Sequence, residues 1–185
     1  MVSDLQAPLV CPREIVREDW IDYNGHLNMA YYNVIFDHSV DHFFDLLNVG
    51  AAYAASGVGS CFSLEVHLHY IQELKLGDQV EVRLQLLDYD QKRLHFFQEM
   101  YHCEKGYLAA TSEQLSMHVD MVSRRSAPFP DGVLSRVEEV FTAHRDLSKS
   151  ERVGHVMGIP KRKYCLLYTS PSPRDRNVSR MPSSA

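Results

Sequence analysis

The sequence predicts an α+β domain in which an antiparallel sheet wraps around one long central helix. Residues 28–47 contain neither Pro nor Gly and are apolar over much of the helix circumference, which is typical of a helix largely surrounded by protein. Four strand-like segments separated by short turns follow this helix. Because the strands follow the helix instead of alternating with it, one sheet is expected to cover it.

The elements are expected in the following order. A short strand at 13–18 precedes the polar turn W-I-D-Y-N-G-H, in which Asn24 and Gly25 supply turn chemistry. After the helix at 28–47, strands are predicted at 60–70, 79–87, 93–103 and 107–122. The turns L-G-D, D-Y-D-Q and E-K-G between them favour an antiparallel meander. A second helix is predicted at 131–145, with Asp131 as its cap.

The end of the chain, 165–185, is predicted to be translated sequencing adapter and not native protein. Written as codons, 165–175 resembles the transposon end of a short-read library adapter, and 179–185 fits its flow-cell end. The few bases between them have the length of a sample index. A genuine disordered tail rich in Ser and Pro is the other interpretation. Residues 1–164 are accordingly expected to form a single domain.

Composition excludes several classes of partner. The net charge is −5 and no Lys/Arg-rich block is present, which argues against nucleic acid or an anionic membrane. No stretch approaches the roughly 20 apolar residues of a membrane span, and the N-terminus lacks a secretory leader pattern. Cys11, Cys61 and Cys103 form no disulfide or zinc-binding pattern. The sequence therefore predicts a cytoplasmic protein.

The densest polar cluster lies directly before the long helix, where Asp22, Asn24, His26 and Asn28 occupy alternate positions. Free backbone N–H groups and the positive dipole end of a helix suit a developing oxyanion, such as a thioester carbonyl under attack. Asp22 could then activate water or attack directly. In the structural alternative, Asp22 and Asn28 only cap the turn and helix, and His26 is an ordinary surface side chain.

The string D-Y-N-G-H-L-N-M-A-Y-Y is similar to the signature D-x-N-G-H-x-N-N-x-x-Y of the 4-hydroxybenzoyl-CoA thioesterase-like hotdog family. Y-I-Q-E-L-K-L-G-D at 70–78 is a second element typical of that family. The resemblance implies the hotdog fold, an acyl-CoA substrate, thioester hydrolysis without a cofactor, and a homodimer or tetramer whose sites are shared between subunits. Met29 departs from the signature, which usually has a second Asn there.

By this resemblance Asp22 matches the catalytic carboxylate, and the amides near Gly25 and His26 match the oxyanion-binding region, with Asn24 and Asn28 positioning the substrate. A narrower resemblance is to betainyl-CoA thioesterases of carnitine breakdown. It rests on F-S-L-E-V-H-L-H-Y from Phe62, D-Q-K-R-L-H-F-F-Q-E-M from Asp90 and A-T-S-E-Q-L from Ala110. A quaternary ammonium is recognised by aromatic faces. Candidate aromatics, all of which could instead be core, are Trp20, Tyr23, Tyr31, Tyr32 and Phe36.

Glu65, His67 and His69 alternate along one predicted strand and should share a face. If that face looks toward the helix start, Glu65 could serve as a second catalytic acid or base, or recognise a cation, and His67 could contact substrate. The alternative is a solvated outer face, because the other alternation, Leu64, Val66 and Leu68, looks more like core.

A metal site could start from His67 and His69, or from His38 and His42 one helical turn apart. Both spacings arise by chance, and no third ligand stands at a diagnostic spacing. No metal and no cofactor are therefore expected. Two further functions stay open: a hotdog enoyl-CoA hydratase or dehydratase that uses Asp22 with His26, and a non-catalytic acyl-CoA-binding protein.

Overall fold

The computed structural model describes residues 5–159. Within the described part, residues 5–155 belong to one compact unit that holds all the helices and strands, and residues 156–159 form neither. The segment interpreted as translated adapter, 165–185, lies outside the described residues. In the described part, no helix is both long and apolar enough to cross a membrane.

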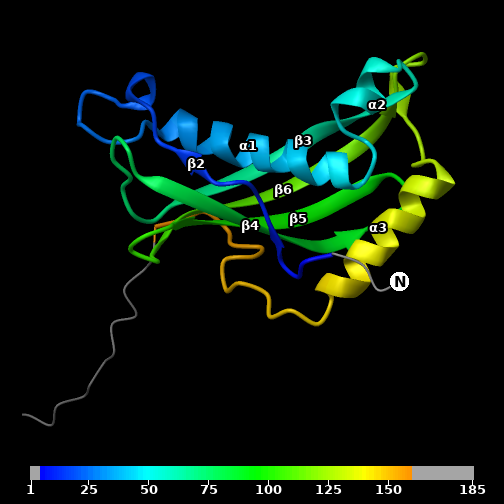
Figure 1. Cartoon of the computed structure of the whole chain (residues 1–185). Helices are drawn as coiled ribbons and strands as arrows, with labels where there is room; N and C mark the ends of the chain where they lie inside the picture. Colours follow the sequence, from blue (N-terminus) through cyan, green and yellow to red (C-terminus); the bar gives the residue numbers. More distant parts are fainter. Residues whose placement is uncertain (1–4, 160–185) are drawn as a thin grey trace, which may run out of the picture. The chain divides into compact units, whose positions relative to one another are not determined.

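The central helix α1 spans Met29–Leu46, close to the predicted limits. Asn28 is its N-cap, and the Asn28 side-chain oxygen accepts a hydrogen bond from the Ala30 amide at 3.0 Å. Figure 1 shows α1 lying across one face of the sheet. The side chains that α1 buries include Tyr32, Ile35, Phe36, Val40 and Phe43.

One antiparallel sheet covers α1, which confirms the predicted α+β hotdog architecture. Its strands are β1 Leu9–Val10, β2 Glu14–Ile15, β3 Gly59–Tyr70, β4 Gln79–Tyr89, β5 Arg93–His102, β6 Leu108–Asp120 and β7 Arg125–Ser126. The main order is β1-β4-β5-β6-β3, and β2 pairs with β4 and β7 with β6. The ring centroids of Phe96 on β5 and Phe43 on α1 lie 5.5 Å apart, so the core lies between the helix and the sheet.

The predicted meander is correct only for β4, β5 and β6. Strand β3 pairs with β6, so the predicted hairpin-type turn at L-G-D is wrong. Residues 71–78, called the crossover below, instead pack against the start of α1, where the Leu27 amide donates to the Leu74 carbonyl at 2.8 Å. Leu74 is fully buried there. The crossover, anchored by the buried Leu74, carries the chain from the β3 edge of the sheet to β4.

The short elements differ most from the prediction. The strand expected at 13–18 divides into β2 and a 3-10 helix, η1, at Glu18–Trp20. The sequence did not predict β1, β7 or the helix α2 at Ala51–Ala55. The helix α3, Asp131–His144, is the expected second helix, but its N-cap is Pro130. Asp131 is therefore not the predicted cap: it is already helical, and its charge favours the first turn instead.

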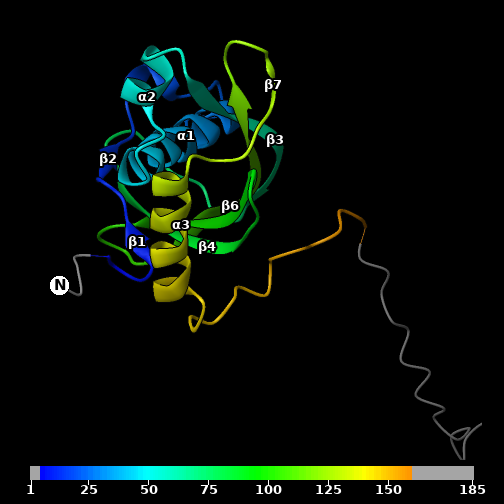
Figure 2. The same cartoon turned by 90° about the vertical axis from the view of Figure 1, so that its right-hand side faces the viewer.

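Helix α3 lies against the sheet beside β4 (Figure 2), and His144 fastens its end to the rest of the domain. Its Nδ1 accepts a hydrogen bond from the Leu86 amide of β4 at 2.9 Å, and its Nε2 lies 3.1 Å from the Gln6 carbonyl oxygen, to which it donates. Burial lowers the pKa of His144. The imidazole is therefore held neutral with both ring nitrogens satisfied.

This arrangement predicts a pH-dependent stability. Below about pH 6.5, the ordinary pKa of histidine, the unfolded chain binds a proton that folded His144 does not bind, so the free energy of unfolding falls as the pH drops. His144→Gln removes this titration. We expect the variant to lose less stability than the wild type between about pH 7 and pH 5.5 in urea unfolding, and equal losses would contradict the assignment.

Candidate active site at the start of the central helix

Residues 20–28, called the helix-start turn, form a closed loop. Ile21 and Leu27 make a bridge, the Asp22 amide donates to the His26 carbonyl at 3.0 Å, and the Asn28 amide donates to the Trp20 carbonyl at 2.9 Å. Gly25 has a φ of +83°, a conformation that glycine adopts without steric cost. The backbone of the turn therefore fixes where its polar side chains lie.

The carboxylate of Asp22 is held in place and is mostly covered by protein. Its Oδ1 accepts a hydrogen bond from the Asn24 amide at 2.7 Å, and 16% of its side chain is exposed. His26 lies between two carboxylates: its Nδ1 is 3.9 Å from Asp22 Oδ1, and its Nε2 is 3.4 Å from Glu73 Oε2 on the crossover. The turn thus brings Asp22, Asn24 and His26 together, and adds Glu73 to them.

The amides of this turn are not all available to a ligand. The Gly25 amide donates to the Asp22 carbonyl at 3.0 Å, and the Asn24 amide is used by the Asp22 carboxylate. Among the hydrogen bonds within residues 5–159, none uses the amide of His26 or of Met29. These two N–H groups lie at the positive dipole end of α1 and are free to meet an oxyanion.

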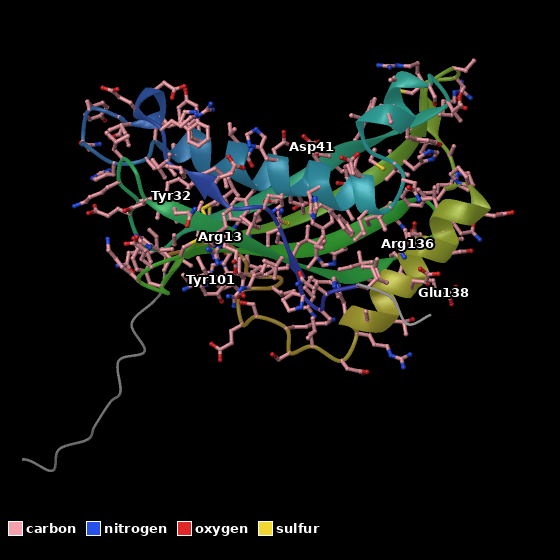
Figure 3. The ribbon with its side chains drawn as sticks, viewed as in Figure 1. Arg13, Tyr32, Asp41, Tyr101, Arg136 and Glu138 are labelled. Carbon is pink, nitrogen blue, oxygen red and sulfur yellow. The ribbon has the colours of Figure 1, made fainter. Side chains whose placement is uncertain are left out.

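A cavity of about 290 Å³ opens beside Asp22. Figure 3 shows Tyr32 near the beginning of α1. The rings of Tyr32 and Tyr70 pack edge-on, with their centroids 5.3 Å apart. The Tyr32 hydroxyl accepts a hydrogen bond from the Leu74 amide at 3.1 Å. Burial raises the pKa of Tyr32 to about 12, so it stays protonated. The cavity is lined by Asp22, Leu27, Met29, Tyr32, Tyr70, Ile71, Gln72 and Glu73.

Trp20, a predicted substrate contact, lies inside the core. Only 2% of it is exposed, the Tyr31 ring stacks on it at 5.5 Å, and the guanidinium carbon of Arg17 lies 4.0 Å from its ring centroid. Trp20 therefore anchors the helix-start turn in the core. Among the other candidate aromatics, Phe36 is fully buried and Tyr23 is 97% exposed. Of the five candidates, all in the described part, only Tyr32 lines the cavity.

Glu65 and His67 lie on the outer face of the sheet, the face away from α1. The register places Glu65 beside Leu115 and His67 beside Glu113. The intervening Val66 lies beside Gln114, which in turn lies beside Phe96. Because Phe96 packs on α1, Val66 is on the face toward the helix, and Glu65 and His67 are on the other face. Within one protomer, Asp22 and Glu65 line separate cavities, and the structure does not bring them together. The proposed role of Glu65 as a second acid or base therefore lacks the geometry it required in a single chain.

Sequence reasoning missed Glu73 and Tyr70 as site residues. Both belong to the stretch Y-I-Q-E-L-K-L-G-D, whose likeness to a family element was the available signal. Their position depends on the crossover, where a hairpin was predicted, so the sequence did not place them beside Asp22.

The family model described as the Thioesterase-like superfamily matches residues 16–137, a range that contains the helix-start turn, the crossover and strands β3 to β6. The chain belongs to the thioesterase-like superfamily. Its activity is the hydrolysis of an acyl-CoA thioester, which confirms the prediction from the helix-start motif.

Individual relatives of this thioesterase have narrower descriptions. The betainyl-CoA thioesterase of Pseudomonas aeruginosa is 42% identical over 145 residues, which cover 78% of this chain and 91% of that protein. An L-carnitine dehydrogenase/betainyl-CoA thioesterase of Rhizobium meliloti is 32% identical, and the match covers 84% of this chain but 31% of that longer protein.

Two solved structures share the fold at similar identity. A Staphylococcus aureus protein solved in complex with CoA superposes with a TM-score of 0.77 at 31% identity, and the match covers 85% of this chain and 100% of that one. A putative thioesterase from Pseudomonas putida KT2440 gives a TM-score of 0.73 at 32% identity, covering 84% and 99% of the two chains.

The cap at Asn28 predicts a stability difference between two close variants. Asn28→Ala removes the acceptor for the Ala30 amide and should lower the free energy of unfolding by about 1 kcal/mol. Asn28→Asp keeps an acceptor and adds a charge that the helix dipole favours, so it should unfold like the wild type. Chemical unfolding of the three proteins measures this, and equal losses in both variants would refute the cap.

Proposed function

We propose that this thioesterase hydrolyses betainyl-CoA to betaine and free CoA, and that Asp22 is its catalytic carboxylate. The observation that supports the site is the position of the Asp22 carboxylate, held by the Asn24 amide next to two unused amides at the start of α1. The substrate proposal is supported by the 42% identity to the Pseudomonas aeruginosa betainyl-CoA thioesterase.

The turn supplies the groups that thioester hydrolysis needs. As base, the Asp22 carboxylate takes a proton from a water molecule whose oxygen attacks the thioester carbonyl carbon. The oxyanion accepts hydrogen bonds from the His26 and Met29 amides. The C–S bond then breaks, and the CoA sulfur leaves with the proton that Asp22 holds. In the other route, Asp22 itself attacks, CoA leaves, and water hydrolyses the resulting anhydride.

The cavity beside Asp22 has groups suited to a trimethylammonium. Tyr70 is partly exposed and forms an aromatic pair with Tyr32, and the exposed carboxylate of Glu73 adds negative charge on the same wall. Aromatic faces attract quaternary ammonium ions through the ring quadrupole. In this proposal Tyr32, Tyr70 and Glu73 select the betainyl group, and Asn24 and Asn28 keep the turn in place.

We further propose that the active form is a homodimer paired along β3. This 12-residue strand is the last in the sheet order and, among the described strands, pairs on one side only. It exposes apolar side chains, including Leu64 at 49% and Val66 at 41%. A long apolar edge strand favours pairing with another chain.

Pairing along β3 would also complete the active site. In an antiparallel pairing of β3 with its copy, the Phe62 end of one strand lies beside the Tyr70 end of the other. The cavity that holds Asp22 opens at the Tyr70 end. The second subunit would therefore close this cavity, as expected for sites shared between subunits, and two such dimers could form a tetramer.

The proposed location is the cytoplasm. The described cysteines Cys11, Cys61 and Cys103 are free thiols, which fits a reducing compartment.

Asp22→Asn should lower kcat for CoA release by at least about 100-fold, because the amide cannot act as base or nucleophile. The amide oxygen can still accept from the Asn24 amide, so the turn should stay folded. Asp19→Asn is the matched control, since it removes the same charge from an exposed carboxylate of η1. Near-normal kcat in Asp22→Asn would refute the catalytic role.

The substrate proposal predicts a higher kcat/KM for betainyl-CoA than for acetyl-, hexanoyl- or 4-hydroxybenzoyl-CoA in the same CoA-release assay. Glu73→Gln should reduce the value for betainyl-CoA more than that for acetyl-CoA, because only the first carries a cation. Preference for an uncharged acyl group would keep the thioesterase and reject this substrate, and hydration of an enoyl-CoA without CoA release would favour the hydratase.

Val66→Lys should convert the dimer to a monomer in light scattering and abolish most turnover, because it places a charge at the centre of the proposed pairing. Val122→Lys is the control: it makes the same change at an exposed valine outside β3. An active monomer, either in the wild type or in Val66→Lys, would contradict both the pairing and the shared site.

A further inference from the structure

Three histidines gather on the outer face of the sheet. His67 and His69 project from β3, and His155 ends the post-helix segment, residues 146–155. The ring centroids of His67 and His69 lie 4.6 Å apart, those of His69 and His155 lie 4.6 Å apart, and those of His67 and His155 lie 5.9 Å apart. One nitrogen from each ring can be chosen so that all three lie within 4.8 Å of one another.

His155 is the third candidate ligand, which spacing in the sequence did not identify. In Figure 1 the post-helix segment passes along the side of the sheet opposite α1. It is held there by the Gly154 amide, which donates to Glu113 Oε2 at 2.7 Å, while Glu113 Oε1 lies 2.8 Å from His95 Nε2. The carboxylate of Glu113 on β6 thus fixes the residue next to His155.

The arrangement is close to a metal-binding geometry. Metal–nitrogen bonds of about 2.0–2.1 Å place tetrahedral ligands about 3.4 Å apart, so nitrogens that lie within 4.8 Å of one another must approach by up to about 1.4 Å. His155 is exposed and can rotate to do this. Arg152 Nη1 lies 3.4 Å from His69 Nδ1 and donates to it, so this hydrogen bond must be released for His69 to bind a metal.

The surroundings also favour a cation. The cavity beside the cluster has a volume of about 470 Å³ and is lined by His67 and His155 together with the carboxylates of Glu65 and Glu113. These two carboxylates offset the charge of Arg152 and of a bound ion. Imidazole nitrogen is a preferred ligand of Zn²⁺, Ni²⁺ and Cu²⁺, and three imidazoles with an open position suit such an ion.

We propose that His67, His69 and His155 bind a divalent ion of the zinc class, and that the ion fastens the post-helix segment to the outer face of the sheet. The two elements that supply the ligands are far apart in the sequence. A bound ion therefore links them, and its binding free energy adds to the stability of their contact. This site is separate from the cavity of Asp22 and does not depend on the substrate proposal.

The test is zinc titration of the full chain, made without a histidine tag and freed of metal, in competition with a chromogenic chelator. We expect one zinc ion per chain. His155→Ala and His69→Ala should each weaken binding by at least about tenfold, the lower bound for loss of even an outer-shell partner of a metal ligand. His42→Ala, which removes an exposed histidine of α1, should bind zinc like the wild type.

Hydrogen exchange then tests whether zinc fastens the post-helix segment to the outer face of the sheet. Zinc should slow exchange of the amides in residues 146–155 of the wild type and of His42→Ala, but not of His155→Ala. Unchanged affinity in His155→Ala, or loss of binding in His42→Ala, would overturn the site. Tight binding at these histidines with no change in exchange would overturn the fastening.

Discussion

The proposed active site depends on the contact between the helix-start turn and the crossover. The Leu27 amide donates to the Leu74 carbonyl at 2.8 Å, and the Leu74 amide donates to the Tyr32 hydroxyl at 3.1 Å. Leu74 is thus fixed through both of its backbone polar groups while its side chain is buried. This contact sets Glu73 near His26 and forms the wall of the cavity beside Asp22.

The topology explains why that contact exists. Since β3 pairs with β6, the chain must travel from the edge of the sheet to β4 before the meander begins. The crossover does so over the start of α1, where free amides and the helix dipole already favour an anion. The pairing of β3 therefore determines both the free edge available for a second subunit and the cavity next to it.

The two faces of the sheet have different chemistry because the strands alternate. On the face toward α1, the buried side chains of Gln98 and Gln114 are hydrogen-bonded: Gln114 donates to Gln98 and Ser112, and Gln98 donates to the Phe36 carbonyl. On the outer face, His95 and Glu113 pair beside the histidine cluster. Burial and the neighbouring His67 lower the pKa of His69 there. Acyl transfer and metal binding can therefore occur in one domain without sharing a residue.

Local patterns predicted the local structure well. The absence of Pro and Gly defined α1, and the turn chemistry of Asn24 and Gly25 marked the loop that carries Asp22. The pairing of β3 was not predictable in this way, because it joins residues that are far apart in the sequence, such as Gly59 and Asp120. Alternation showed that Glu65 and His67 share a face but not which one, and no spacing rule connects His69 to His155.

In the proposed mechanism the thioester binds at the helix-start turn. Amide chemical shifts of the chain, recorded while an unreactive thioether analogue of betainyl-CoA is added, test it most directly. We expect the largest shifts at the amides of His26 and Met29, with smaller ones on the crossover. Shifts confined to the outer face, at the amides of Glu113 and Gly154, would contradict it.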